Sequence, residues 1–259
     1  MKIPFQKYQA TGNDFIIVDN RSGNIRLTTE QIQHLCDRKF GIGADGFMLI
    51  ETHPTLDFNL IYYNSDGSQS LCGNGSRAAV QMAATLGMIE RDTTFQAYDG
   101  PHQATRLANG LIQLKMNPVS GIQKSGDAVF INTGSPHLIQ FVASAPVVNV
   151  VEEGRAIRYS EPFKPGGTNV NFTELQDGQL LVRTYERGVE DETLSCGTGV
   201  TAAALAAHFR GYTSPVHVKT KGGELSVTFE PTSEGGFKEI YLTGPAVKVF
   251  DGVFELDNS

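Results

Sequence analysis

Two short cysteine-glycine turns in this chain have the composition needed for proton transfer at carbon. The first is Cys72-Gly73-Asn74-Gly75, and the second is Cys196-Gly197-Thr198-Gly199. Each turn opens into an alanine-rich run, and the two cysteines are 124 residues apart in a chain of 259 residues. Two equivalent thiols on two half-chains indicate a symmetric reaction, and symmetric chemistry at carbon is racemisation or epimerisation.

The backbone around each cysteine would help its sulfur to ionise. If each turn begins a helix, the cysteine lies at the positive end of the helix dipole, which lowers the thiol pKa. The amides of residues 73–75 and 197–199 would form two nests for an anion. With the turns facing each other, one thiolate would remove an α-proton while the other thiol protonates the opposite face. We expect no metal and no cofactor, because this chemistry needs neither and the sequence offers no clear pyridoxal phosphate lysine or metal cluster.

Other paired segments indicate that the two turns belong to a longer repeat. Thr11–Ile17 corresponds to Thr133–Ile139, at an offset of 122 residues. Tyr63–Gly67 precedes the first turn, as Tyr185–Gly188 precedes the second, at the same offset. Three pairs in one order at nearly one spacing predict an internal duplication.

The elements that position these turns are expected to be mostly strands. Each half, 1–117 and 118–248, would wrap a mainly antiparallel β-sheet around one buried helix, which is an α/β (α+β) fold. The segments 76–86 and 200–209 are rich in alanine and lack a strongly polar face, as is typical of a buried helix. A third, amphipathic helix is expected at 29–38 with Thr28 or Thr29 as its cap. The expected strands are 15–19, 47–51, 58–63, 111–116, 128–133, 180–185, 216–220, 225–229 and 238–243.

Composition excludes several classes of function. The chain is 40% hydrophobic and 19% charged, which is typical of a soluble globular protein. A net charge of −7 and a pI near 5.4 argue against nucleic acid or an anionic membrane as the main partner. No apolar stretch is long enough to span a bilayer, and Met1–Ala10 lacks the apolar block of a secretion signal. Three cysteines do not suggest a disulfide framework, so we expect a reduced, cytoplasmic location.

The motifs taken together resemble the diaminopimelate epimerase family of cofactor-independent amino-acid epimerases. Any one motif alone is a weak signal, whereas their combination in order is specific and covers nearly the whole chain. The segments that carry the resemblance are 10–15, 63–68, 72–77, 134–137, 169–172, 185–188 and 196–199.

The resemblance implies a role for each matching residue. Cys72 and Cys196 are similar to the family's two acid/base cysteines. The carboxylate cradle at the reacting centre would be Gly73, Asn74, Gly197 and Thr198. The clamp on the distal, non-reacting end would be Asn64, Asn169 and Arg187, with Glu186 facing an ammonium, Asn13 lining the pocket and His137 as an auxiliary histidine.

The resemblance also implies an architecture and a substrate. The family has two pseudo-symmetric halves with the site in the cleft between them, and its last strand, here 249–259, returns to the first half. We expect a homodimer that interconverts LL- and meso-diaminopimelate. Two positions depart from the family pattern: Ser135 stands where many members carry Asn, and Gly46 where some carry Gln.

Simpler interpretations of the same residues remain open. A buried cysteine is often only a small hydrophobic residue, and Cys36 lacks the glycine context altogether. Arg187 and Glu186 could form a surface ion pair, and the asparagines could be turn residues. Asp14 and Asp66 are expected to hold loops.

Three other functions compete with the diaminopimelate reaction. One is a two-cysteine racemase for proline or hydroxyproline, whose substrate has no second amino-acid end. Another is a phenazine-type isomerase, which both cysteines disfavour. A third is an amino-acid-binding or redox-sensing protein in which the two thiols form a disulfide.

Overall fold

The computed structural model describes residues 1–256 and divides the chain into two compact units. Unit 1 consists of Met1–Leu114 together with the segment from Gly244 onward, and unit 2 is Lys115–Thr243. These boundaries differ by three to five residues from those expected at 117/118 and 248/249. The difference arises because strands, rather than loops, carry the chain from one unit into the other.

Unit 1 is a sheet of eight strands in which most neighbours are antiparallel. Only β2/β3 and β4/β5 are parallel pairs. The strands in spatial order are β17 (Val247–Glu255), β1 (Lys2–Ala10), β2 (Asn13–Asp19), β3 (Gly46–Glu51), β4 (Phe58–Asn64), β5 (Asp92–Ala97), β6 (Gly100–Arg106) and β7 (Ile112–Met116).

Unit 2 repeats this topology with the same sequence of strand directions. Its parallel pairs are β10/β11 and β12/β14, which correspond to β2/β3 and β4/β5. The strands in order are β8 (Gln123–Ser125), β9 (Ala128–Asn132), β10 (Pro136–Phe141), β11 (Asn169–Gln176), β12 (Gln179–Glu186), β14 (Val216–Thr220), β15 (Gly223–Pro231) and β16 (Phe237–Gly244). The short β13 (Asp191–Thr193) pairs with the far end of β12.

Each repeat ends with a strand that completes the other unit. β8 follows β7 in the chain but pairs with β9, and β17 follows β16 but pairs with β1. Both pairings are antiparallel, so β8 and β17 occupy equivalent positions in the two sheets. The return strand expected at 249–259 is thus present as β17, while residues 257–259 lie outside the described part of the chain.

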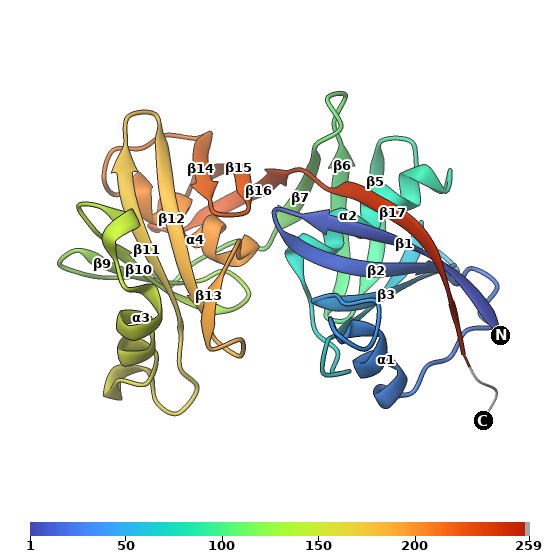
Figure 1. Cartoon of the computed structure of the whole chain (residues 1–259). Coiled ribbons are helices and arrows are strands. Elements are labelled where there is room, and N and C mark those ends of the chain that lie inside the picture. The colour runs from blue at the N-terminus through green and yellow to red at the C-terminus, as the bar shows by residue number, and fades with distance from the viewer. Residues whose placement is uncertain (257–259) are drawn as a thin grey trace. The chain divides into compact units, whose positions relative to one another are not determined.

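The two alanine-rich helices lie inside their own strands. α2 (Gly73–Thr85) packs against β1, β2, β3, β4 and β6, and α4 (Gly197–His208) packs against strands β9 to β12, β14 and β15 (Figure 1). Ten of the twelve residues of α4 are buried, as the absence of a polar face predicted. Both helices begin three residues earlier than predicted, directly after the cysteines, because each glycine turn is itself the first helical turn. The predicted mixed fold with central helices is confirmed.

The remaining helices include one that the sequence did not reveal. α1 (Thr29–Cys36) begins at a capping box in which Thr28 and Gln31 bond to each other's backbone, as expected, and ends two residues early. α3 (Val150–Arg158) packs on β11 and β12 and was not predicted. A glycine in the middle of a segment argues against a helix, and Gly154 is the reason that α3 was missed. A Cβ at Gly154 would lie 2.4 Å from Cβ of Tyr185. Glycine is therefore required there for close packing. Two 3₁₀ turns, η1 (Ala145–Val147) and η2 (Glu161–Phe163), flank α3.

Several strands were also missed by pattern alone, notably β1, β5, β6, β10 and β11. β1 alternates buried and exposed residues over only part of its length, because Lys7 is buried within it. Within residues 1–256, no helix has both the length and the apolar character needed to cross a bilayer.

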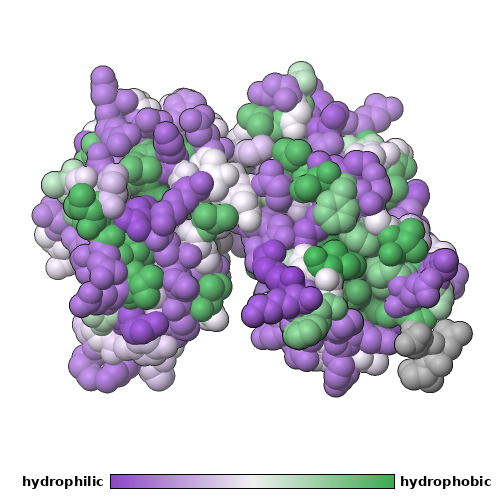
Figure 2. Space-filling view, in the orientation of Figure 1, coloured by the Kyte–Doolittle hydropathy of each residue, from purple (hydrophilic) through white to green (hydrophobic). Residues whose placement is uncertain are grey.

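β17 has one face in the core of unit 1 and one face in solvent. Phe254 is buried and its ring lies 6.0 Å from that of Phe5 and 6.5 Å from that of Phe47, measured between centroids. The neighbouring Val253 is 61% exposed, and Val249 and Phe250 are also exposed. Figure 2 shows apolar residues gathered along the strip of unit 1 that β17 crosses in Figure 1.

Removing the Phe254 ring is expected to destabilise unit 1 without touching either cysteine. Phe254→Ala leaves a cavity between Phe5 and Phe47, and we expect it to lower the free energy of unfolding by about 3 kcal/mol. Glu255→Ala, one residue away from Phe254, removes an exposed ion pair with Lys2 and is the matched control, which should cost less than about 1 kcal/mol. Urea unfolding of both variants measures the difference. Equal losses would show that β17 is not anchored through Phe254.

Candidate active site

Both cysteines occupy the same structural position, the N-cap of the buried helix in their unit. The backbone of Cys72 has φ −127° and ψ 112°, and that of Cys196 has φ −116° and ψ 113°. These extended conformations are those of a helix N-cap, where the amides of the first turn lack helical acceptors. Each sulfur therefore lies beside the positive end of a helix dipole, as the sequence predicted.

The two sulfurs differ in their immediate hydrogen bonds. Sγ of Cys72 accepts from the Gly75 amide at 3.3 Å, whereas Cys196 makes no side-chain capping bond. The Gly75 amide is therefore engaged with the thiol, and the expectation that it forms part of an open anion nest was wrong. Sγ of Cys196 instead lies 3.5 Å from Oγ1 of Thr198.

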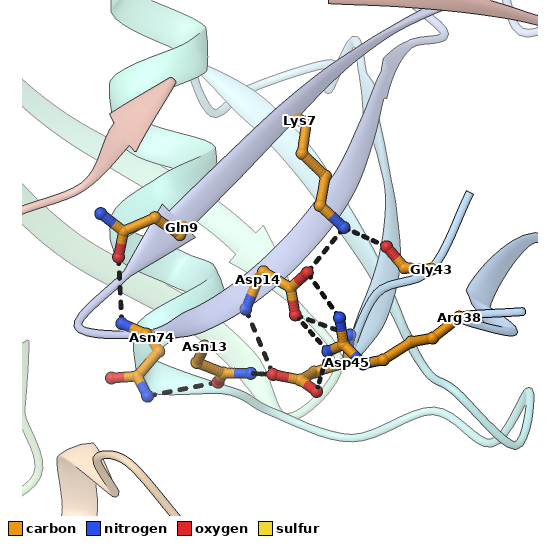
Figure 3. A network of polar contacts seen from close by, with 9 residues as sticks. Lys7, Gln9, Asn13, Asp14, Arg38, Gly43, Asp45 and Asn74 are labelled. Carbon is orange, nitrogen blue, oxygen red and sulfur yellow. Dashed lines mark hydrogen bonds and ion pairs between the residues drawn. The ribbon is translucent and has the colours of Figure 1, made fainter. Parts of the chain in front are cut away.

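Asn13 contacts the first thiol directly. Its Oδ1 lies 3.6 Å from Sγ of Cys72 and accepts from Nδ2 of Asn74 at 3.2 Å. Its Nδ2 donates to Asp45 at 2.7 Å, so the orientation of the Asn13 amide is fixed from both ends. Figure 3 shows Asn13 between Asn74 and Asp45. Residue 13 was assigned to the pocket from the family resemblance, and the structure places it beside the sulfur.

A network of charges holds Asn13 and its loop in place. Asp14 accepts from Arg38 at 2.6 Å and pairs with Lys7 at 2.7 Å, while Arg38 also pairs with Asp45 at 2.7 Å (Figure 3). Lys7 donates in addition to the Gly43 carbonyl. Burial would raise the pKa of Asp14, but the hydrogen bonds from Arg38 and Lys7 outweigh burial and lower it to about 2. Asp14 thus holds the loop, as expected. Asp66 does the same in its own loop by accepting from Ser68.

Tyr62 is a neighbour of Cys72 that the sequence did not single out. Its side chain is buried on β4, and burial, followed by the negative charge of Cys72, raises the tyrosine pKa far above its usual value. Gly46 makes room for this ring, because a Cβ there would lie 2.7 Å from the Tyr62 hydroxyl. A side chain at residue 46 would therefore collide with Tyr62, which explains why this chain has glycine at that position.

In unit 2, His137 is buried among polar side chains. Its Nδ1 lies 3.0 Å from Nδ2 of Asn171, whose Oδ1 accepts from Thr184, so Nδ1 is the acceptor. Nε2 therefore carries the proton, and it lies 2.9 Å from both Oγ of Ser135 and Oγ1 of Thr198. Burial and then the charge of Arg187 lower the pKa of His137 to about 3. The histidine is neutral at physiological pH and orients Thr198, which contacts Cys196.

Ser135 and Asn13 are structural equivalents, and this pair relates the two half-sites. Asn13 begins β2 and Ser135 directly precedes β10, and the two residues are 122 positions apart. Asn13 bonds to Asn74, and Ser135 lies 3.3 Å from Thr198, the corresponding residue after the second cysteine. Ser135 therefore takes the place in the second half-site that Asn13 takes in the first.

The residues expected at the distal end hold turns in this structure. Asn64 donates to Ser68 and accepts from Ser70, which closes the turn after β4. Asn169 is buried, donates to the Pro136 carbonyl at 2.9 Å and accepts from the Arg187 amide at 2.8 Å.

Glu186, the last residue of β12, and Arg187, which follows it, contact different partners. The Arg187 guanidinium is exposed and donates to the Gly166 carbonyl at 3.2 Å. Glu186 accepts from Thr193 at 2.8 Å. Asn169 thus fixes the backbone of Arg187 while the charged end of that side chain reaches solvent.

Cys36 is the third cysteine of the chain. It is buried in the core of unit 1, and burial raises its thiol pKa to about 11. A thiol of this kind stays protonated at neutral pH and is a poor nucleophile. It is a structural residue, as the lack of a glycine context indicated.

The protonation state of His137 predicts how stability depends on pH. The unfolded chain binds a proton near pH 6.5, whereas folded His137 does not until about pH 3. Stability is therefore lost as the pH falls through this window, by up to about 1.4 kcal/mol per pH unit from this residue. We expect His137→Gln to flatten that part of the profile.

The measurement is urea unfolding from pH 7 to pH 4. His34→Gln, which changes an exposed histidine of α1, is the control and should keep the wild-type slope. Parallel profiles for wild type and His137→Gln would contradict the assignment.

Comparison with known proteins agrees with these features. The family model "Diaminopimelate epimerase" matches residues 5–120 and 129–249. Curated diaminopimelate epimerases from Flavobacterium psychrophilum and Chlorobaculum tepidum are 48% and 43% identical, over 95% of this chain and 97–98% of theirs.

Solved structures with low sequence identity share the fold. A phenazine biosynthesis protein of the PhzF family from Bacillus anthracis has a TM-score of 0.76 at 16% identity, covering 99% of this chain and all of that one. A hydroxyproline epimerase from Agrobacterium vitis has a TM-score of 0.71 at 15% identity, covering 99% and 93%. On the family match and the curated relatives together, this chain belongs to the diaminopimelate epimerase family and is an isomerase.

Proposed function

We propose that this protein interconverts LL- and meso-2,6-diaminopimelate, in lysine and peptidoglycan precursor biosynthesis, by proton transfer between Cys72 and Cys196. The observation that carries the proposal is that both cysteines cap the buried helix of their unit in nearly identical backbone conformations. A second support is the family match over almost the whole chain. The reaction as proposed needs no cofactor.

In the proposed reaction, the two sulfurs act on opposite faces of one α-carbon. A thiolate takes the α-proton, so that an S–H bond forms as the C–H bond breaks and the electron pair stays on carbon and carboxylate. The other thiol then gives its proton to the opposite face, which inverts the configuration and leaves a thiolate there. The reverse reaction exchanges the two roles, so protons and charge balance in each direction.

The carboxylate at the reacting centre is proposed to bind at the helix N-termini. The cradle residues are Gly73 and Asn74 of α2 and Gly197 and Thr198 of α4. Charge grows on this carboxylate as the proton leaves, and one preorganised hydrogen-bond donor of this kind typically lowers the barrier by about 2.7–4 kcal/mol. His137 is proposed to assist indirectly by orienting Thr198, because a neutral imidazole with a pKa near 3 does not exchange protons at neutral pH.

The distal amino-acid end of the substrate is proposed to meet the residues at the ends of β4 and β12 and at the start of β11. The exposed Arg187 guanidinium offers a bidentate fork for a carboxylate, and Glu186 offers an anion for the ammonium. Asn64 and Asn169 would support this end from the turns they close. Proline and hydroxyproline have no second amino-acid end, so a proline racemase would leave these groups without a ligand.

We also propose that the protein is a cytoplasmic homodimer. The exposed apolar side chains on the solvent face of β17, including Val249 and Val253, support a covered surface there, because contiguous exposed apolar patches often mark interfaces.

Light scattering should give twice the chain mass for wild type and the single-chain mass for Val249→Lys/Val253→Lys. Thr228→Lys, a charge added to β15 of unit 2, is the control. A monomeric wild type would refute the dimer.

The decisive test of the function is turnover of LL-diaminopimelate in heavy water. We expect meso product with deuterium at one α-carbon, and we expect Cys72→Ser and Cys196→Ser each to lose at least about a hundredfold in kcat, because each removes an essential acid or base. Cys36→Ser is the matched control and should keep activity.

Other outcomes of the same assay discriminate the competing functions. Turnover of proline in preference to diaminopimelate would indicate a proline-type racemase. Tight binding of diaminopimelate by the reduced protein without inversion or label uptake would indicate a binding protein. Full epimerase activity in Cys72→Ser would exclude the two-base scheme.

A further inference from the structure

Arg77 is a buried cation that the reaction described above does not use. It lies in the second turn of α2, and its side chain is fully buried. Nη2 donates to Oδ1 of Asn74 at 3.0 Å and to Oγ1 of Thr11 at 3.2 Å. Within residues 1–256, Nε and Nη1 have no hydrogen-bond partner and no carboxylate forms an ion pair with this guanidinium.

A cation buried in this way needs a compensating charge. Removing an ion from water costs several kcal/mol even after the protein relaxes, unless an opposite charge is close. Burial lowers the pKa of Arg77 to about 10, and the charge that opposes this lowering is that of Cys72. At neutral pH the guanidinium therefore keeps its proton, and Cys72, at the N-cap of the same helix, is the group whose ionisation would stabilise it.

Arg77 also reaches the first half-site through oriented amides. Because Arg77 donates to Oδ1 of Asn74, the Nδ2 of Asn74 must face Asn13, to which it donates. Asn13 in turn donates to Asp45. The row from Arg77 to Asp45 fixes the direction of both amides, and Figure 3 shows its Asn74–Asn13–Asp45 part.

The other charged and titratable groups around Cys72 are largely paired among themselves. Lys7 on β1, Asp14 on β2, Arg38 after α1 and Asp45 before β3 form the network described above. Tyr62 on β4 is a further titratable group, which bonds to Cys72 and stays protonated, because burial and the negative charge of Cys72 both raise its pKa. Cys36 also interacts with Tyr62 and stays protonated, because burial raises its pKa to about 11. A protonated tyrosine donates to a thiolate and therefore supports the anion.

The second unit has no counterpart of this cation. The residue at the equivalent helix position is Thr201, which is neutral and donates to the Gly197 carbonyl at 2.9 Å. The buried histidine of that half-site, His137, is neutral as well. The two repeats therefore give their cysteines the same backbone but a different electrostatic surrounding.

We infer that Arg77 is a positioning residue that holds Cys72 as the thiolate in the ligand-free protein, so that residue 72 is the base before substrate binds. This inference deepens the proposed two-base reaction and rests on it for its catalytic meaning. The two-base scheme requires one ionised and one protonated sulfur at the start of each turnover. Because the buried cation is present in the first repeat and not in the second, it selects which of the two sulfurs is ionised.

The test is the pH dependence of alkylation by iodoacetamide in the ligand-free protein, with each cysteine followed separately by peptide mass spectrometry. In wild type we expect Cys72 to react with a midpoint pH below that of Cys196. In Arg77→Met the Cys72 midpoint should rise by about one unit or more, while the Cys196 midpoint stays in place. Arg77→Lys keeps the charge and should restore most of the wild-type midpoint.

Controls separate an electrostatic role from a structural one. Arg106→Met removes a different arginine that contacts α2, through Gln81, and should leave the Cys72 profile unchanged. Thermal unfolding checks that Arg77→Met folds, and an apolar replacement of a buried unpaired cation is often neutral for stability. Equal midpoints for both cysteines in wild type, or an unmoved Cys72 midpoint in Arg77→Met, would overturn the inference.

This experiment contains no diaminopimelate, so its outcome is independent of the proposed substrate. If the alkylation profiles behave as expected while diaminopimelate is not turned over, the electrostatic role of Arg77 stands and the proposed function fails. If diaminopimelate is turned over while Arg77→Met leaves the profile unchanged, the function stands and the role of Arg77 fails.

Discussion

The N-terminus of a helix buried inside its own sheet is the constraint on which both half-sites depend. The N–H groups of the first helical turn have no acceptor within the helix, so in a buried helix the unpaired donors lie together at its N-terminus. A cysteine at the N-cap then lies beside concentrated positive potential without any charged neighbour on the surface. The requirement for burial explains the alanine-rich composition of α2 and α4, and the requirement for an open first turn explains the glycines after each cysteine.

The two repeats share their strand arrangement and the backbone of their cysteines, but they differ in the polar residues around each sulfur. The strand directions agree from β1 to β7 and from β9 to β16, and the cysteines share their backbone conformation. The polar residues around the sulfurs differ at equivalent positions: Asn13 and Ser135, Arg77 and Thr201. The proposed proton transfer at one carbon needs one base and one acid of similar geometry. A common frame with different buried polar groups meets both needs.

The last strand of each repeat pairs with the first strand of the other repeat. β8 pairs with β9 although it follows β7 in the chain, and β17 pairs with β1 although it follows β16. In unit 1 this places Phe254, from the end of the chain, against Phe5 near its start. The core of unit 1 therefore contains side chains from both ends of the described chain.

Much of this was determined by the sequence itself. The repeat, both helix starts near Cys72 and Cys196, the capping box of α1 and the structural role of Asp14 follow from local composition and spacing. The tertiary structure alone decided the turn-closing contacts of Asn64 and Asn169, the neutral state of His137, the presence of Tyr62 beside a thiol and the burial of Arg77. The physical reason is that hydrogen-bond partners and desolvation come from residues distant in the chain. α3, which contains Gly154, was not predicted from local sequence for the same reason, because the ring that requires glycine there belongs to Tyr185 on β12.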